Sequence, residues 1–158
     1  MSDIVVQKNI GAYGNLVRLT DVASATAAGA GDATLVTGQA IDRLVIGNGS
    51  LPSSALVGVL YEAVLTAGKT LTITPVVQDS GDDSTWAAYN TPTPVVIAAP
   101  AGGGTVRGEA NFQVDLRAAR RYVRLEFTPD LSATATDTAT LIGAAFFAGV
   151  DTLPASNV

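Results

Sequence analysis

Apolar and polar side chains alternate along several short stretches of the chain, with the period of two that is typical of a half-buried β-strand. Residues 109–117 and 120–130 are the clearest cases, and they predict an inward-facing set of Ala110, Phe112, Val114, Leu116, Val123, Leu125 and Phe127. The short segment "RAAR" between these two runs is expected to be a corner. The pattern therefore predicts two strands joined by a tight connection.

Further strands are predicted at residues 16–21, 41–46, 56–65, 70–79, 95–98 and 138–150. Pro75 lies inside one of them and implies an edge or a bulge where the strand changes partners, because proline has no N–H for the ladder. The last run is apolar on both faces around Phe146 and Phe147, so it is expected in mid-sandwich or under a partner. Some eight short strands, roughly ten residues apart, predict an all-β fold, an antiparallel jelly-roll-like β-sandwich.

The predicted sandwich domain covers residues 16–150, preceded by an extended N-terminal arm at 1–15 and followed by a C-terminal tail at 151–158. Two stretches of small side chains, residues 22–34 and 130–137, interrupt the strand pattern. They have almost no bulky side chain to anchor in a core, so they are expected to be loops that become ordered on contact.

The amino-acid composition limits the kinds of chemistry that the chain can perform. The chain has 158 residues, 47% of them apolar and only 15% charged, so it can bury a core and must finish its surface with small polar side chains. It contains no cysteine and no histidine, which excludes disulfides, thiolate chemistry and the commonest general base and zinc ligand. We expect no enzymatic activity and no cofactor. Catalysis by carboxylates alone stays an alternative, although no pair of acids stands out.

Charge and hydropathy bear on partners and location. The net charge of -5 has the wrong sign for a protein whose surface grips a phosphate backbone, so no nucleic-acid partner is expected. The longest apolar run, residues 139–150, is about half the length of a membrane-spanning helix, so no membrane partner is expected either. Residues 1–15 lack the apolar segment of a signal peptide, which predicts synthesis in the cytoplasm.

The acidic segment "DSGDDS" carries three carboxylates, Asp79, Asp82 and Asp83, within five positions. It does not fit the helix-loop-helix calcium motif, because the third position is Gly81 and the twelfth is Asn90. A looser cation site formed by the three carboxylates stays open. The favoured interpretation is a hairpin loop, since Asp, Ser and Gly tolerate turn dihedrals and bond to nearby backbone.

A cluster of arginines flanks the "RAAR" corner beside Tyr122. It could bind phosphates, with the tyrosine stacking on a base. The alternative, which the acidic net charge favours, is that these arginines pair with Asp115, with Glu126 or with carboxylates of a partner. The cluster consists of Arg117, Arg120, Arg121 and Arg124.

Three segments together resemble the jelly-roll capsid cement (decoration) proteins of tailed bacteriophages. They are "TLTITPVVQDSGDDSTWAAY", "RAARRYVRLEFTPD" and "TLIGAAFFAGVDTLP". The likeness lies in a strand that ends in a hydrophilic loop and a tryptophan, an Arg-rich corner, and a terminal apolar strand leading to a Leu-Pro tail. It covers residues 57–154. Related signatures occur in other phage structural proteins, including head-tail and tail components.

The resemblance implies a non-enzymatic virion protein on the exterior of the capsid. Such a protein binds the shell as a homo-oligomer, with a dimer favoured and a trimer as the alternative, and clamps neighbouring major capsid protein subunits. An alternative function is a carbohydrate- or surface-binding jelly-roll module, assisted by calcium at the acidic loop. The residues expected to contact partners are Ile4, Val5, Val6, Tyr13, Trp86, Tyr89, Arg120, Arg121 and Arg124.

Overall fold

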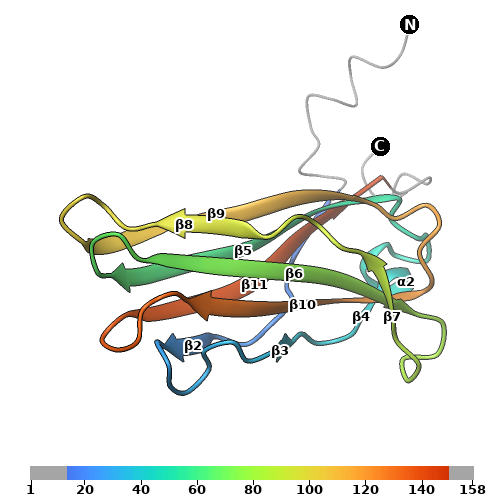
Figure 1. Ribbon diagram of the computed structural model, residues 1–158. Helices are drawn as coiled ribbons and strands as arrows, with labels where there is room; N and C mark the ends of the chain where they lie inside the picture. The colour runs from blue at the N-terminus through green and yellow to red at the C-terminus, as the bar shows by residue number, and fades with distance from the viewer. Residues whose placement is uncertain (1–13, 150–158) are drawn as a thin grey trace, which may run out of the picture.

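The computed structural model describes residues 14–149, which form two antiparallel β-sheets packed against each other (Figure 1). One short helix, α2 (Arg43–Ile46), interrupts the strands. The strands are β1 (Asn15–Arg18), β2 (Ala23–Thr26), β3 (Val36–Thr37), β4 (Ile41–Asp42), β5 (Ser54–Leu65), β6 (Thr70–Ser80), β7 (Ala87–Asn90), β8 (Val95–Ala98), β9 (Gly104–Asp115), β10 (Tyr122–Leu131) and β11 (Thr138–Ala148).

Several short strands share one neighbour and act as a single interrupted strand. β1 and β2 pair with successive parts of β11, β3 and β4 with β10, and β8 and β7 with β6. One sheet therefore runs β1/β2, β11, β5, β9, and the other runs β3/β4, β10, β6, β7/β8. Eight strands in two sheets, with most connections crossing from one sheet to the other, form the arrangement of a jelly roll. The predicted all-β jelly-roll-like sandwich is confirmed.

Pro75 lies where β6 exchanges one neighbour for another. On that edge β8 pairs with residues 70–73 and β7 pairs with residues 77–79, so no ladder hydrogen bond is needed from Pro75. On the other side Pro75 lies opposite Phe127 of β10. The predicted change of partners is confirmed, and a register shift between Val77 and Gln78 accompanies it.

The core lies between the two sheets and contains the side chains that the alternation placed inward. Leu125 and Phe127 are fully buried, and Phe112 is half-buried at the margin. Burying a side chain of this size stabilises the fold by about 1.5–3 kcal/mol. Gly143 of β11 faces this layer, where a Cβ atom would lie 2.7 Å from Leu125 Cδ2. A larger residue there would force the sheets apart.

The predicted strand at residues 41–46 is wrong beyond Asp42. The Asp42 carboxylate accepts a hydrogen bond from the Leu44 N–H at 3.0 Å and caps α2, while the Gly47 N–H donates to the Arg43 carbonyl at its end. The apolar run that favoured a strand is a single helical turn, which turns the Arg43 side chain into the interior.

The two small-residue stretches are not loops throughout, so this prediction is also wrong in part. The first contains β2, where Ala25 is 1% exposed, and the second contributes the end of β10 and the buried Ala133. The Asp32 carboxylate joins the stretches by accepting from the Leu131 N–H and the Ala28 N–H. Small side chains anchor here because they fit into narrow spaces between backbones.

Candidate functional site

Three segments that are far apart in the sequence meet at one end of the sandwich, which we call the α2 end. It comprises residues 42–53 around α2, residues 79–90 of the β6–β7 loop and residues 115–124 of the β9–β10 corner (Figure 1). The described chain also begins and stops there. Asn15 Nδ2 donates to the Ile46 carbonyl, and Ser53 Oγ donates to the Gly149 carbonyl at 2.9 Å.

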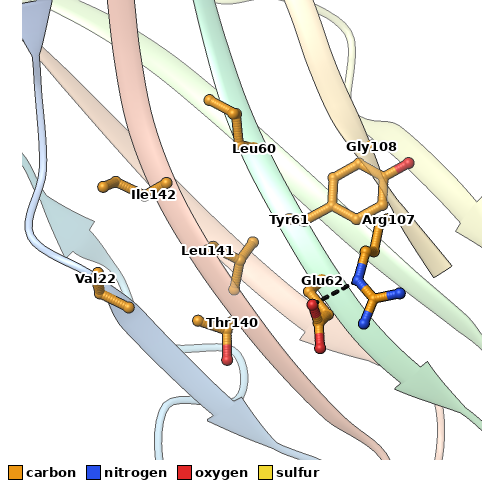
Figure 2. Close-up of a pocket in the computed structure, with 9 residues that line it drawn as sticks. All are labelled: Val22, Leu60, Tyr61, Glu62, Arg107, Gly108, Thr140, Leu141 and Ile142. Atoms are coloured by element: carbon orange, nitrogen blue, oxygen red, sulfur yellow. Dashed lines mark hydrogen bonds and ion pairs between the residues drawn. The ribbon is translucent and has the colours of Figure 1, made fainter. Parts of the chain in front are cut away.

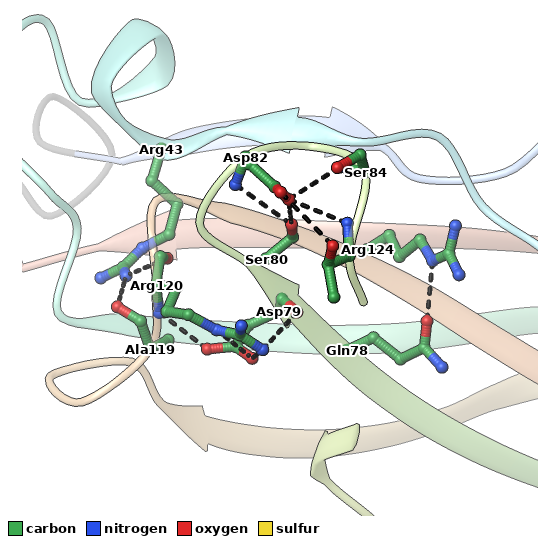
Figure 3. A network of polar contacts seen from close by, with 10 residues as sticks. Arg43, Gln78, Asp79, Ser80, Asp82, Ser84, Ala119, Arg120 and Arg124 are labelled. Atoms are coloured by element: carbon green, nitrogen blue, oxygen red, sulfur yellow. Dashed lines mark hydrogen bonds and ion pairs between the residues drawn. The ribbon is translucent and has the colours of Figure 1, made fainter. Parts of the chain in front are cut away.

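Arg43 holds the α2 end together from inside. Its side chain is 1% exposed, and its guanidinium donates hydrogen bonds to four backbone carbonyls, those of Pro52, Leu116, Ala119 and Arg120. Figure 3 shows Arg43 beside Ala119 and Arg120. Burial lowers the pKa of this guanidinium. Sequence analysis did not single out Arg43. An arginine in an apparent strand is read as a surface residue, and its carbonyl partners leave no signal in the sequence.

Asp79, a candidate metal ligand, is bound by Arg120 instead. Asp79 is 5% exposed, and its carboxylate accepts from the Arg120 backbone N–H at 2.8 Å, from Nε at 3.0 Å and from Nη2 at 2.7 Å (Figure 3). Burial raises the pKa of Asp79, but the hydrogen bonds and charge of Arg120 outweigh it and hold the pKa below its ordinary value. The corner and the end of β6 are thus joined.

The other two candidate ligands belong to the loop itself. The Asp82 carboxylate accepts from the Thr85 N–H at 2.8 Å and the Ser84 N–H at 3.0 Å, and these bonds hold its pKa far below the ordinary value. Asp83 occupies a left-handed turn position with φ 60°. Within residues 14–149, no group of three or more acidic side chains converges as metal ligands would. Residues 81–86 connect β6 to its antiparallel neighbour β7, which is the predicted hairpin.

The remaining corner arginines also have carboxylate partners within the chain. Arg117 fixes Asp115 strongly enough to lower the pKa of that carboxyl to about 2. Glu126 is 7% exposed and accepts from Arg124. All four arginines are therefore engaged, two with the expected partners and two with carboxylates that the sequence did not suggest. The pairs are Arg117–Asp115, Arg120–Asp79, Arg121–Asp42 and Arg124–Glu126.

Trp86 and Tyr89 belong to the same end. The Trp86 ring lies 4.3 Å from the Arg124 guanidinium carbon, in a cation–π stack, and Arg124 Nε also donates to the Gln78 side chain at 2.8 Å. The Tyr89 hydroxyl donates to the Asp115 carbonyl. Five of the predicted contact residues thus come together here. The other four, Ile4, Val5, Val6 and Tyr13, lie outside the described residues.

A second surface of note covers the outer side of the β1/β2–β11–β5–β9 sheet. Five of the nine large apolar side chains that are exposed within residues 14–149 lie on it, beside two half-buried ones from β11. We call this surface the outer apolar face, and it consists of Leu16, Val22, Leu56, Leu60, Val64, Ile142 and Phe146. The two-sided apolarity of the last strand pointed to this surface. The outward positions of residues 56–65 carried the same signal, which sequence analysis missed.

The outer apolar face is hollowed at one place. A shallow groove of about 360 Å³ lies among Val22, Leu60 and Ile142, as Figure 2 shows. Beside it Glu62 and Arg107 form an exposed ion pair at 2.6 Å. No helix within residues 14–149 has the length and apolarity needed to cross a membrane.

No family model and no curated protein matches this chain. Solved structures resemble it weakly. A structure of infectious bursal disease virus, Gx strain, is 14% identical with a TM-score of 0.45, over 85% of this chain and 32% of that one. The PBSX exported protein XepA is 17% identical with a TM-score of 0.41, over 89% of this chain and 38% of that one. Clostridium thermocellum xylanase 10B, comprising CBM22-1 and GH10 modules, is 9% identical with a TM-score of 0.46, over 92% of this chain and 30% of that one.

This chain spans about a third of the length of each of these neighbours. They include proteins of virus particles beside a carbohydrate-active enzyme. At these identities and TM-scores, the likenesses carry no argument about what this chain binds.

Proposed function

We propose that this chain is a structural virion protein, a capsid cement (decoration) protein that binds the exterior of a tailed-phage head and clamps neighbouring major capsid protein subunits. The observation that carries the proposal is the α2 end. It gathers Trp86, Tyr89, Arg120, Arg121 and Arg124 from distant segments into one surface. These are five of the nine residues that we expect, from the sequence, to contact partners.

The α2 end is held in place before any partner arrives. Arg43 fixes the corner from below, Asp79 fixes Arg120, and Asp42 fixes Arg121. Side chains that are already ordered lose little conformational entropy on binding, so weak contacts suffice. On a symmetric shell the same contacts repeat many times. A protein that binds only the assembled shell makes its disassembly less favourable by linkage.

The proposal includes no catalytic step and no cofactor. The chain has no histidine or cysteine, and the Asp42, Asp79 and Asp115 carboxylates of the α2 end are each bound by an arginine. Synthesis in the host cytoplasm and a place on the capsid exterior follow from the same proposal.

The test mixes the purified protein with shells of the major capsid protein that lack it, and measures co-sedimentation and heat resistance. We expect binding at a fixed ratio per capsid subunit, and shells that survive heating better. Arg121→Glu, at the exposed rim of the α2 end, is expected to weaken binding by roughly tenfold or more. The matched control, Lys69→Glu, reverses a charge in the β5–β6 turn at the opposite end and is expected to bind normally.

Protein that stays in the supernatant beside intact shells contradicts the proposal. Glycan arrays would then test the carbohydrate-binding alternative. Equal loss of binding in both charge variants would instead show that the α2 end is not the contact surface.

A further inference from the structure

We propose that the outer apolar face binds a second copy of this chain around a two-fold axis that lies over Gly58 and Ala144. The proposal does not rest on shell binding, because it concerns the outer side of one sheet, whereas the proposed shell contact lies at the α2 end. A row of large side chains, a row with small residues and a row beside a groove follow one another along β5 and β11.

Three successive rows cross the outer apolar face. The first row carries Leu16, Phe146 and Leu56 side by side, and Leu16 at its β1 end is 77% exposed. In the second row Ala144 lies between Arg18 and Gly58, and neither Ala144 nor Gly58 has a large side chain. The third row pairs Ile142 with Leu60 and contains the groove beside Val22.

These rows make the face complementary to itself. The proposed two-fold axis lies parallel to the face, perpendicular to the strands and over the middle row. A half-turn about this axis reverses the order of the rows in the facing copy. It places the first row of one copy, with its exposed Leu16, over the Leu60 row and the groove of the other copy, and the reverse. The two rows are four residues apart on β5, about 13 Å in an extended strand. Such reciprocal contact is the property that a closed dimer interface needs.

The polar groups of the face follow the same symmetry. The Asn111 side chain lies over Gly58, on the proposed axis, where its amide can donate to and accept from the amide of the facing copy. On β9, Arg107 lies opposite Glu62 of β5, which is four residues after Gly58. Asp115 lies opposite Ser54 of β5, which is four residues before Gly58. The axis therefore brings Arg107 over the Asp115 of the second copy, a pairing of opposite charges.

Charge and size also favour a second copy. The chain carries a net charge of -5, which opposes self-association through most surfaces. On this face, Arg18 pairs with Asp21 and Glu62 with Arg107, so little charge is left unpaired there. A sheet four strands wide and eleven residues long presents about 700 Å² at ordinary strand spacing, close to the roughly 800 Å² that each partner buries in a stable complex.

The first test measures mass by light scattering and sedimentation equilibrium over a range of concentrations. We expect the wild-type chain to be a dimer. Leu60→Lys places a charge in the groove row of both copies, and we expect it to raise the dimer dissociation constant by about 100-fold or more. Within one chain the new lysine lies opposite Glu109, so folding should be retained, as circular dichroism can verify. The control is Val96→Lys, at a 63% exposed position of the other sheet, which should stay dimeric.

The second test locates the axis. Because the chain has no cysteine, Ala144→Cys introduces a single thiol next to the proposed axis, and a short bis-maleimide should link two copies at low concentration. Val96→Cys should give no such product.

A monomeric wild-type chain overturns the proposal. A dimer that Leu60→Lys leaves intact, or that Ala144→Cys does not link, overturns the proposed face or axis. Shell binding by a monomeric wild-type chain would refute this inference while supporting the cement function, so the two proposals fail separately.

Discussion

The buried carboxylate of Asp79 and the guanidinium of Arg120 form a two-point ion pair, with Nε at 3.0 Å and Nη2 at 2.7 Å from the same oxygen. The other oxygen accepts the Arg120 backbone N–H. The first residue of the acidic segment is therefore part of the joint between β6 and the β9–β10 corner. It does not act with its two neighbours in the loop.

Asp79→Asn is expected to lower the free energy of unfolding by about 1–3 kcal/mol at pH 7, because the buried Arg120 bonds lose their charged acceptor. The folded pKa of Asp79 lies below its ordinary value. Its contribution is therefore fully present above the unfolded pKa of about 4 and is lost as the pH falls through the folded pKa. Urea titrations of both proteins between pH 7 and acid should show the difference shrinking below about pH 4.

The control for this prediction is Asp83→Asn. Asp83 is exposed and has φ 60°, a conformation that asparagine adopts readily, so stability should change little at any pH. A stability difference for Asp79→Asn that stays constant down to low pH would contradict the assigned ion pair.

Arg43→Met is expected to destabilise the chain by roughly 3 kcal/mol or more, because several buried carbonyls lose their donor at once. Urea denaturation measures this loss, and limited proteolysis should show earlier cleavage in the 116–121 corner. Arg117→Met removes an arginine of an exposed ion pair in the same corner and should have little effect. Equal effects of the two substitutions would show that Arg43 is not the anchor of the corner.

The parts of the fold that sequence analysis predicted depend on local alternation. Leu125 and Phe127 point inward because β10 alternates, and Pro75 marks a change of partners because proline cannot join a ladder on that side. These properties belong to the residue or to its immediate neighbours. They hold wherever the strand is placed in the sandwich.

The parts that were missed depend on distant partners. Residues 43–46 look like a strand until the Asp42 cap and the carbonyls around Arg43 are known. Ala25 is buried because β2 pairs with β11, more than a hundred residues away in sequence. The α2 end likewise depends on ion pairs such as Asp42–Arg121, which neither sequence segment reveals by itself.

The acidic loop is expected to be indifferent to calcium, with an unchanged melting temperature on addition of the ion or of a chelator. Asp82 stabilises the loop by accepting from the Thr85 and Ser84 N–H groups. Asp82→Ala should therefore speed protease cleavage within residues 81–86, because the loop backbone loses its acceptor. Asp130→Ala, at an exposed position of β10, should leave cleavage unchanged. A calcium-dependent rise in melting temperature would contradict the hairpin interpretation and support the calcium-assisted alternative.

Trp86 is the only tryptophan of the chain, so its fluorescence reports directly on the stack with Arg124. Arg124→Gln removes the cation above the ring and the ion-pair partner of the nearly buried Glu126, and should cost about 1–3 kcal/mol of stability. The ring then becomes more accessible to water, so its emission should shift to longer wavelength and iodide should quench it more strongly. Arg124→Lys keeps a cation near the ring but not the planar stacking group, and should give an intermediate shift. An unchanged spectrum in Arg124→Gln would show that Trp86 is held in place by other contacts, and would remove the stack from the preformed surface of the α2 end.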